Sequence, residues 1–220
     1  MNNFTMYGIG IFVTLFLILA GFAVYSYSRI FWCAAVGAGL SNFNGVENNI
    51  YIDNELESSE SARLHLLINQ ARSRITNKYG SMISNPVIIV AGNRESAEKY
   101  GLGPGHQAVR AYITPWGQYL VISSRTQHVN LIAHEYFHIE ISERTGYLAF
   151  KTKLPVWLDE GLALQVDYRE LYKLDNRSFD SSEIDRVKKL DRSSDFFSGN
   201  NEQTTKNMLA AKAAVYEILD

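Results

Sequence analysis

Two histidines stand four residues apart in the segment His134-Glu135-Tyr136-Phe137-His138. On a helix, side chains four residues apart project from one face, so the two imidazoles could hold one zinc ion between them. Glu135 lies beside them and could reach a water molecule on that ion. The same pattern also arises from two histidines with purely structural roles on a half-buried helix. The spacing therefore raises a zinc site as a hypothesis and leaves the structural reading open.

The residues around the two histidines favour a metal site over a purely structural role. The segment around it is apolar: Leu131, Ile132, Ala133, Phe137, Ile139 and Ile141. Buried imidazoles need polar partners, and a metal ion is one such partner. Glu160 follows in a second helical segment, separated from His138 by residues 139–159, which is enough chain to turn and return alongside. A metzincin site is excluded, because Ile141 and Arg144 stand where that motif requires Gly and a third His.

The segments HEYFH and WLDEGLA together resemble the gluzincin clan of zinc metallopeptidases. They are similar to the HExxH and WLNEGFA segments of the aminopeptidase N type and of bacterial peptidase MA-like domains. The resemblance covers about residues 127 to 168, and it implies a zincin-like fold. It also implies that His134, His138 and Glu160 bind Zn²⁺, that Glu135 is the catalytic base, and that the substrate is a peptide or protein. The order of the expected strands and helices independently predicts an α+β domain with a small mixed sheet beside helices.

The chain departs from the family in two places. It has no counterpart of the GAMEN-type motif that reads a free N-terminus, so endopeptidase and exopeptidase action both stay open. Leu164 occupies the position of the Asp that follows the Glu ligand in thermolysin. Asp159 or Asp167 could instead support a zinc ligand from behind.

Two further roles have a structural alternative. Tyr216, in the segment AAVYEIL, is a candidate donor for the developing oxyanion, or else a core tyrosine of an amphipathic helix. The strand from Ala108 to Ile113 could pair with an extended peptide, or else be an ordinary hairpin arm.

Two rival functions remain at this point. One is a non-catalytic gluzincin-like module that binds a peptide or a partner and holds a structural zinc; the intact Glu135 argues against it. The other is a membrane-tethered scaffold without metal.

The stretch from Tyr7 to Tyr27 is apolar, uncharged and about the 20 residues that a membrane-spanning helix needs. A cleaved signal peptide would begin with basic residues, and MNNFTM contains none. We therefore expect a single-pass membrane protein. Arg29, the only charged residue before Glu47, weakly favours a cytoplasmic body, whereas the resemblance to exported enzymes favours an extracytoplasmic one. We follow the resemblance and expect an extracytoplasmic catalytic domain.

The rest of the chain predicts one domain. We expect an anchor over residues 1–28, a juxtamembrane linker over 29–48 and a metallopeptidase domain over 49–220. Its expected elements are strands near 49–53, 86–91, 108–113 and 119–123, and helices over 58–79, from 129 to Gly146, from Pro155 to about 172, and over about 205–219.

Composition narrows the function classes. The chain contains 21 Lys and Arg against 23 Asp and Glu, so it lacks the basic excess that nucleic-acid binding uses. Its single cysteine, Cys33, can form neither an internal disulfide nor a cysteine-ligated zinc site. Any zinc must therefore be bound by histidines and carboxylates.

Overall fold

Continuous apolar runs form the buried strands of the central sheet. The computed structural model describes residues 13–14, 21, 27–47, 49–103, 108–126, 128–174, 179 and 181–219. Within strand β3 (Val87–Ala91), Ile88 and Val90 are buried on one face of the sheet, and Ile89 and Ala91 are buried on the other. Because successive residues of a strand point to opposite faces, this pattern is that of a sheet covered on both sides.

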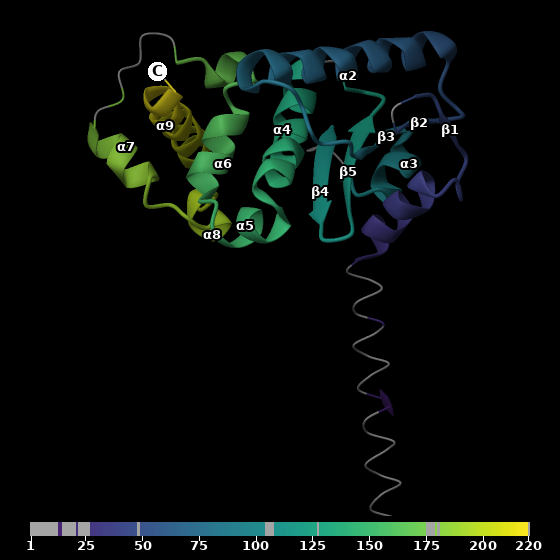
Figure 1. The fold of residues 1–220 in the computed structure, drawn as a ribbon, viewed down its shortest axis with the longest axis horizontal. Coiled ribbons are helices and arrows are strands. Elements are labelled where there is room, and N and C mark those ends of the chain that lie inside the picture. Colours follow the sequence, from purple (N-terminus) through teal and green to yellow (C-terminus); the bar gives the residue numbers. More distant parts are fainter. Residues whose placement is uncertain are drawn as a thin grey trace, which may run out of the picture.

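Five strands form a mixed sheet in the order β1-β2-β3-β5-β4. Strands β2 and β3, and strands β3 and β5, pair in parallel, while the two outer pairs, β1 with β2 and β4 with β5, are antiparallel. The other four strands are β1 (Phe43–Gly45), β2 (Ile50–Asp53), β4 (Val109–Thr114) and β5 (Gly117–Ser123). Strand β4 lies at the edge of the sheet, and its outer side faces helix α4 (Val129–Thr145), as Figure 1 shows.

Helices cover both faces of the sheet. On one face, α2 (Ser58–Tyr79) and α4 (Val129–Thr145) enclose the larger apolar core with the strands. On the other face, the helical residues 27–37 and α3 (Arg94–Lys99) enclose a second core. The sheet is therefore the middle layer of three.

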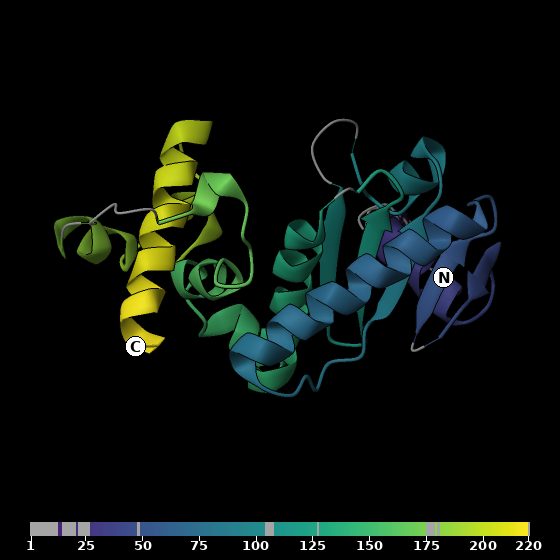
Figure 2. The ribbon, with the colours of Figure 1, turned by 90° about the horizontal axis from the view of Figure 1, so that it is seen from above.

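A helical group stands beside α4, away from α3, as Figures 1 and 2 show. It has its own apolar core, built by buried residues of its helices. The group follows the short helix α5 (Tyr147–Thr152) and consists of α6 (Val156–Ala163), the 3₁₀ turn η1 (Glu170–Tyr172), α7 (Ser181–Val187), α8 (Ser193–Phe196) and α9 (Asn201–Leu219).

The α+β class and the mixed sheet that we expected are confirmed. The helix expected over 58–79 has those bounds, and the four expected strands are present within a few residues. The helix expected from Pro155 to about 172 is shorter, because α6 ends at Ala163 and turns follow it. Asp167 accepts a hydrogen bond from the backbone N–H of Arg169, and such local bonds compete with a helix.

Residues 29–48 differ from the linker that we expected. Residues 27–37 are helical, with Cys33 and Val36 fully buried against the sheet, and Phe43–Gly45 is strand β1. The apolar stretch from Ile30 is too short to span a bilayer, and it covers a sheet face instead. Within the described residues, the packed body therefore begins at about residue 27 rather than at 49.

The membrane span expected over Tyr7 to Tyr27 lies outside the described residues, apart from residues 13–14, 21 and 27. In the part of the chain that the structure describes, no helix has both the length and the apolar character needed to cross a membrane.

Candidate metal centre

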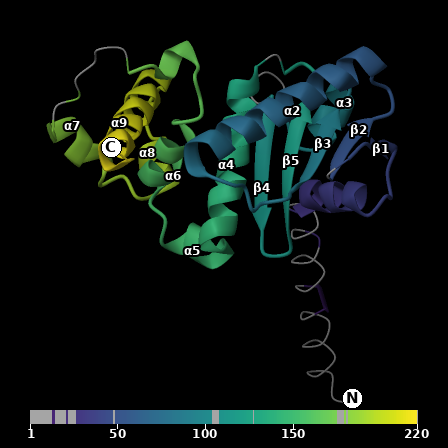
Figure 3. The ribbon, with the colours of Figure 1, turned by 45° about the horizontal axis from the view of Figure 1, so that its top comes forward.

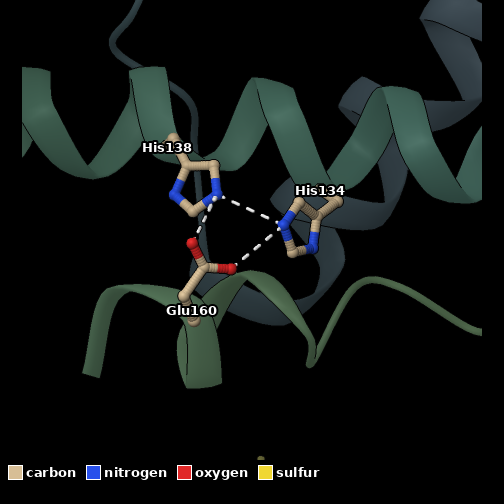
Figure 4. A group of neighbouring side chains, drawn as sticks. All are labelled: His134, His138 and Glu160. Carbon is tan, nitrogen blue, oxygen red and sulfur yellow. Dashed lines mark hydrogen bonds and ion pairs between the residues drawn. The ribbon is translucent and has the colours of Figure 1, made fainter. Parts of the chain in front are cut away.

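The side chains of His134, His138 and Glu160 converge on one point between two packed helices (Figure 4). Helix α4 carries both histidines one turn apart, and α6 brings Glu160 opposite them. The two Nε2 atoms of the histidines lie 3.2 Å apart. From these atoms to the Glu160 carboxylate, the distances are 3.3 Å for His134 and 3.9 Å for His138.

These distances fit a bound metal. Zinc binds His nitrogen at about 2.0–2.1 Å in a tetrahedral arrangement, which places neighbouring ligand atoms about 3.3–3.4 Å apart. Two of the three measured separations are within about 0.2 Å of that value. Among the described residues, Glu160 Oε2 is buried without a hydrogen-bond partner, because its contact with His134 lacks hydrogen-bond geometry. The His/His/Glu group could therefore hold a metal ion.

Each histidine has a carboxylate behind it. Asp159 Oδ1 lies 2.8 Å from Nδ1 of His138, and Asp167 Oδ2 lies 3.5 Å from Nδ1 of His134. A carboxylate at Nδ1 favours the tautomer with its proton there, which leaves the lone pair of Nε2 free for a metal. Asp159 therefore orients His138 for metal binding, whereas Asp167 faces His134 without a hydrogen bond, and Nδ1 of His134 is buried with no hydrogen-bond partner among the described residues.

Asp167 is itself fully buried and tightly held. The guanidinium of Arg169 binds both of its carboxylate oxygens, and the backbone N–H of Arg169 donates to Oδ1 at 3.1 Å. From α9, the ammonium of Lys212 donates to the backbone oxygens of Asp167 and Tyr172. The local turn and a neighbouring helix thus fix the position of Asp167.

The charges around the site favour a cation. Burial by itself lowers the pKa of His138, but the carboxylates of Asp159 and Glu160 outweigh it and raise that pKa to about 10. Burial raises the pKa of Glu160, but His138, His134 and Arg169 outweigh burial and hold the pKa below its usual value. The carboxylates therefore stabilise positive charge at the point where the three side chains meet.

Glu135 is held at the neighbouring sheet edge. Its Oε2 accepts a hydrogen bond of 3.1 Å from the backbone N–H of Ala111 on β4. Since β4 is the outermost strand on this side, that N–H points away from its partner β5. The carboxylate of Glu135 is thereby fixed between the edge strand and the two histidines.

A cavity of about 530 Å³ contains the site. Its walls include the three candidate ligands and Glu135, together with side chains of β4, α5, α8 and α9. An open space of this size beside the ligands leaves room for a substrate, whereas a purely structural metal site is closed by protein ligands.

Tyr216 does not join this group. It is 49% exposed and is not among the described residues that line the cavity. On α9, the buried stripe that faces the other helices includes Ala211, Ala214 and Val215, and Tyr216 follows Val215 on the outer side. Our expectation that Tyr216 donates to the oxyanion is therefore not supported by its position.

Two contacts of the candidate site could not be predicted from the sequence. Arg169 binds Asp167 from only two residues away, a spacing that is common in loops and carries no distinctive signal. The N–H of Ala111 belongs to the backbone, so no residue type could reveal its contact with Glu135.

Comparisons with protein-family models, with curated proteins and with solved structures found no match to this chain.

Proposed function

We propose that this chain is a membrane-anchored zinc metallopeptidase of the gluzincin type, with a zincin-like domain. The observation that carries the proposal is the convergence of His134, His138 and Glu160 at separations of 3.2, 3.3 and 3.9 Å, with Glu135 on the same cavity wall. The donor set of two imidazoles and one carboxylate is that of zinc hydrolases. Membrane anchoring rests on the uncharged apolar stretch from Tyr7 to Tyr27.

His134, His138 and Glu160 would hold the zinc ion, which would act there as a Lewis acid that lowers the pKa of water toward neutrality and polarises a carbonyl. Glu135 takes the proton from the attacking water and then passes it to the leaving amine. The hydrogen bond from Ala111 fixes one oxygen of Glu135, so the other oxygen is available to receive the proton. The carboxylate of Asp159 keeps the imidazole of His138 in place, and the carboxylate of Asp167 lies 3.5 Å from Nδ1 of His134.

The edge of β4 offers a place for an extended peptide. Ser123 donates to the carbonyl of Ala108, so Ala108 bonds toward β5, and Ala111 bonds outward to Glu135. By the alternation of antiparallel strands, Val109, Ala111 and Ile113 therefore turn their backbone groups outward. The carbonyl of Ala111 and both backbone groups of Ile113 can pair with a substrate strand next to Glu135.

The test is the full chain purified in detergent with one equivalent of zinc, incubated with a peptide library of mixed sequence. Glu135→Gln should reduce hydrolysis by at least about a thousandfold while zinc content, measured by elemental analysis, stays at one equivalent. Glu143→Gln is the matched control, because Glu143 is an exposed residue of the same helix. Equal hydrolysis by Glu135→Gln and the parent would overturn the mechanism.

The metal ligands are tested separately from activity. His138→Gln or Glu160→Gln should lower zinc occupancy at limiting zinc, whereas His65→Gln on α2 should leave it unchanged. Full occupancy in both ligand variants would exclude this site. A parent chain that binds zinc but cleaves nothing in the library would favour the non-catalytic binding module instead.

A further inference from the structure

The fold fixes the place where the apolar N-terminal stretch leaves the body. Tyr27, the first residue of the described helix 27–37, packs against Trp116 with their ring centroids 6.3 Å apart. The same helix buries Cys33 and Val36 completely against the sheet. Tyr27, the last residue of the apolar stretch, therefore lies beside Trp116 in a helix that belongs to the packed body.

Trp116 lies in the turn between β4 and β5, and this turn shares one end of the molecule with α5. Figures 1 and 3 both show the turn and α5 at the lower end, with α2 at the upper end. A hydrogen bond of 3.0 Å from Gln118 to Glu143 joins the hairpin to the end of α4, from which α5 follows. We call this end, with the turn and α5, the lower face.

The lower face exposes large apolar side chains with basic residues beside them. Trp116 is 64% exposed and Leu148 on α5 is 71% exposed. Lys151 and Lys153 are exposed next to Leu148, and the chain from 146 to 158 contains no acidic residue. Aromatic, aliphatic and lysine side chains in this combination suit the boundary between acyl chains and anionic headgroups.

The cavity of the candidate metal centre reaches this same face. Ile113 of β4, one residue before Thr114 at the strand's end, lines the cavity, as do Phe150 and Lys151 of α5. Ser193 and Phe197, on and just after α8, line it as well, and Figure 1 shows α8 beside α5 at the lower end. A substrate near the lower face would thus have a short path to Glu135.

We propose that the lower face rests on the lipid bilayer and that the substrate is a polypeptide segment close to the membrane surface. The occupant is a bilayer rather than a second protein, because the uncharged apolar stretch of the sequence ends at Tyr27, which packs against Trp116. The docking is independent of catalysis, whereas the substrate class rests on the proposed peptidase function.

Docking is tested with nitroxide labels on the full chain in vesicles of equal parts phosphatidylcholine and phosphatidylglycerol. Cys33 is the only cysteine and is buried, so the parent chain should stay unlabelled. Leu148→Cys places a label on the lower face. Leu66→Cys is the matched control on α2, where Leu66 is 61% exposed. We expect the label at 148, and not at 66, to be reached by oxygen but shielded from a water-soluble nickel chelate.

Two outcomes overturn the docking. A label at 148 that is as accessible to the nickel chelate as the label at 66 means that the lower face stands in water. A label at 148 that is shielded from both oxygen and the chelate means that it lies against protein, a second copy or another chain.

The substrate class is tested with library peptides that carry an acyl anchor. One set has a spacer of two glycines, and the other has a flexible spacer of about 20 residues, roughly 25 Å in mean length. The double variant Trp116→Asp with Leu148→Asp should cleave short-spacer peptides at least about tenfold more slowly than the parent, because buried charge is costly at the interface. Cleavage of long-spacer peptides should change less than about twofold, since neither residue lines the cavity.

Equal loss on both spacers, or on neither, overturns the membrane-proximal substrate. Leu66→Asp is the control for an added charge far from the lower face. If neither the parent nor any variant cleaves a peptide, the proposed peptidase function fails, and the nitroxide measurements still decide the docking.

Discussion

Buried charge at Asp167 shows how firmly the candidate site is built. A carboxylate without solvent is costly unless it is paired, and Asp167 is fully buried. Arg169 neutralises it through a two-pronged contact with both oxygens, and the turn at residues 167–169 keeps the pair together. Such an arrangement is poorly explained by packing alone. The result is a firmly held carboxylate 3.5 Å from Nδ1 of His134, one of the three residues that could hold a metal ion.

Asp167→Asn should weaken zinc binding by about 10- to 100-fold, the usual effect of losing a carboxylate behind a ligating histidine. The measurement is competition with a chelator of known affinity. Asp159→Asn should act in the same direction through His138, whereas Asp185→Asn, on the exposed side of α7, should not change the affinity. Unchanged zinc affinity in Asp167→Asn, in a variant whose circular dichroism matches the parent, would contradict the role of Asp167.

For individual residues, the sequence predicted the side-chain positions that depend on local spacing along one helix. His134 and His138 share a face because they are four residues apart on one helix, and the structure places them there. The contact between Glu135 and the backbone of Ala111 depends on how α4 sits on the sheet edge. The position of Tyr216 likewise depends on which side of α9 faces α6. Neither follows from the residue types alone.

Helix α6 owes its position to close packing against α9. With eight residues it is too short to be stable alone, so its neighbours must hold it. At Gly161, a Cβ atom would lie 2.5 Å from the backbone oxygen of Ala211 and 2.7 Å from a methyl group of Val215. The glycine next to Glu160 therefore allows α9 to approach and brings Glu160 toward the histidines.

Gly161→Ala decides between two opposite effects. Helix propensity alone would stabilise α6 by about 1 kcal/mol, because Ala is a better helix former than Gly. Overpacking against backbone, which cannot rotate away, typically costs about 1–3 kcal/mol. We expect the clash to dominate, so the free energy of unfolding in urea should fall and zinc affinity should fall with it.

Gly103→Ala is the control for this substitution, since a Cβ at Gly103 would meet no atom of the described residues within 4 Å. It should change the free energy of unfolding by less than about 0.5 kcal/mol. A Gly161→Ala variant that is more stable than the parent would show that α6 and α9 are too far apart for a Cβ at residue 161 to clash with the backbone of Ala211.

The elements that the sequence predicted well are those with long apolar periodicity, such as α2 and the buried strands β3 and β5. Residues 27–45 were harder to assign, because an apolar run that follows a membrane-like stretch has the same composition whether it contacts lipid or a sheet. Only the tertiary fit of Cys33 and Val36 against the sheet resolves the assignment. The small strand β1 also depends on its partner β2, which no local pattern reveals.

For the whole molecule, the helix 27–37 determines whether the body is rigidly joined to its N-terminal stretch. It covers the sheet face opposite α2 and α4, so its loss would expose the buried side chains of β3 and β5 on that face. Gly37 fits closely against Val87, and Tyr51 donates to the carbonyl of Gly37 at 3.4 Å. The helix is therefore part of the core rather than an appended segment.

Cys33 provides a direct measure of this packing. Burial disfavours the charged thiolate and raises the pKa of Cys33 to about 12. At pH 8, only about one molecule in ten thousand then carries the reactive thiolate, against roughly a quarter for an exposed thiol. In the full chain in detergent, Cys33 should react with a thiol reagent at least about a hundredfold more slowly than an exposed cysteine.

In the variant Leu66→Cys, the added thiol lies on the exposed side of α2 and serves as an internal standard for the reaction rate of Cys33. One equivalent of thiol should react rapidly and the second only when denaturant unfolds the body. The denaturant midpoint for the slow thiol should match the midpoint of circular dichroism, since the helix 27–37 and the sheet share one core. Two rapid equivalents in the folded protein would mean that the helix 27–37 detaches from the sheet and is not part of the core.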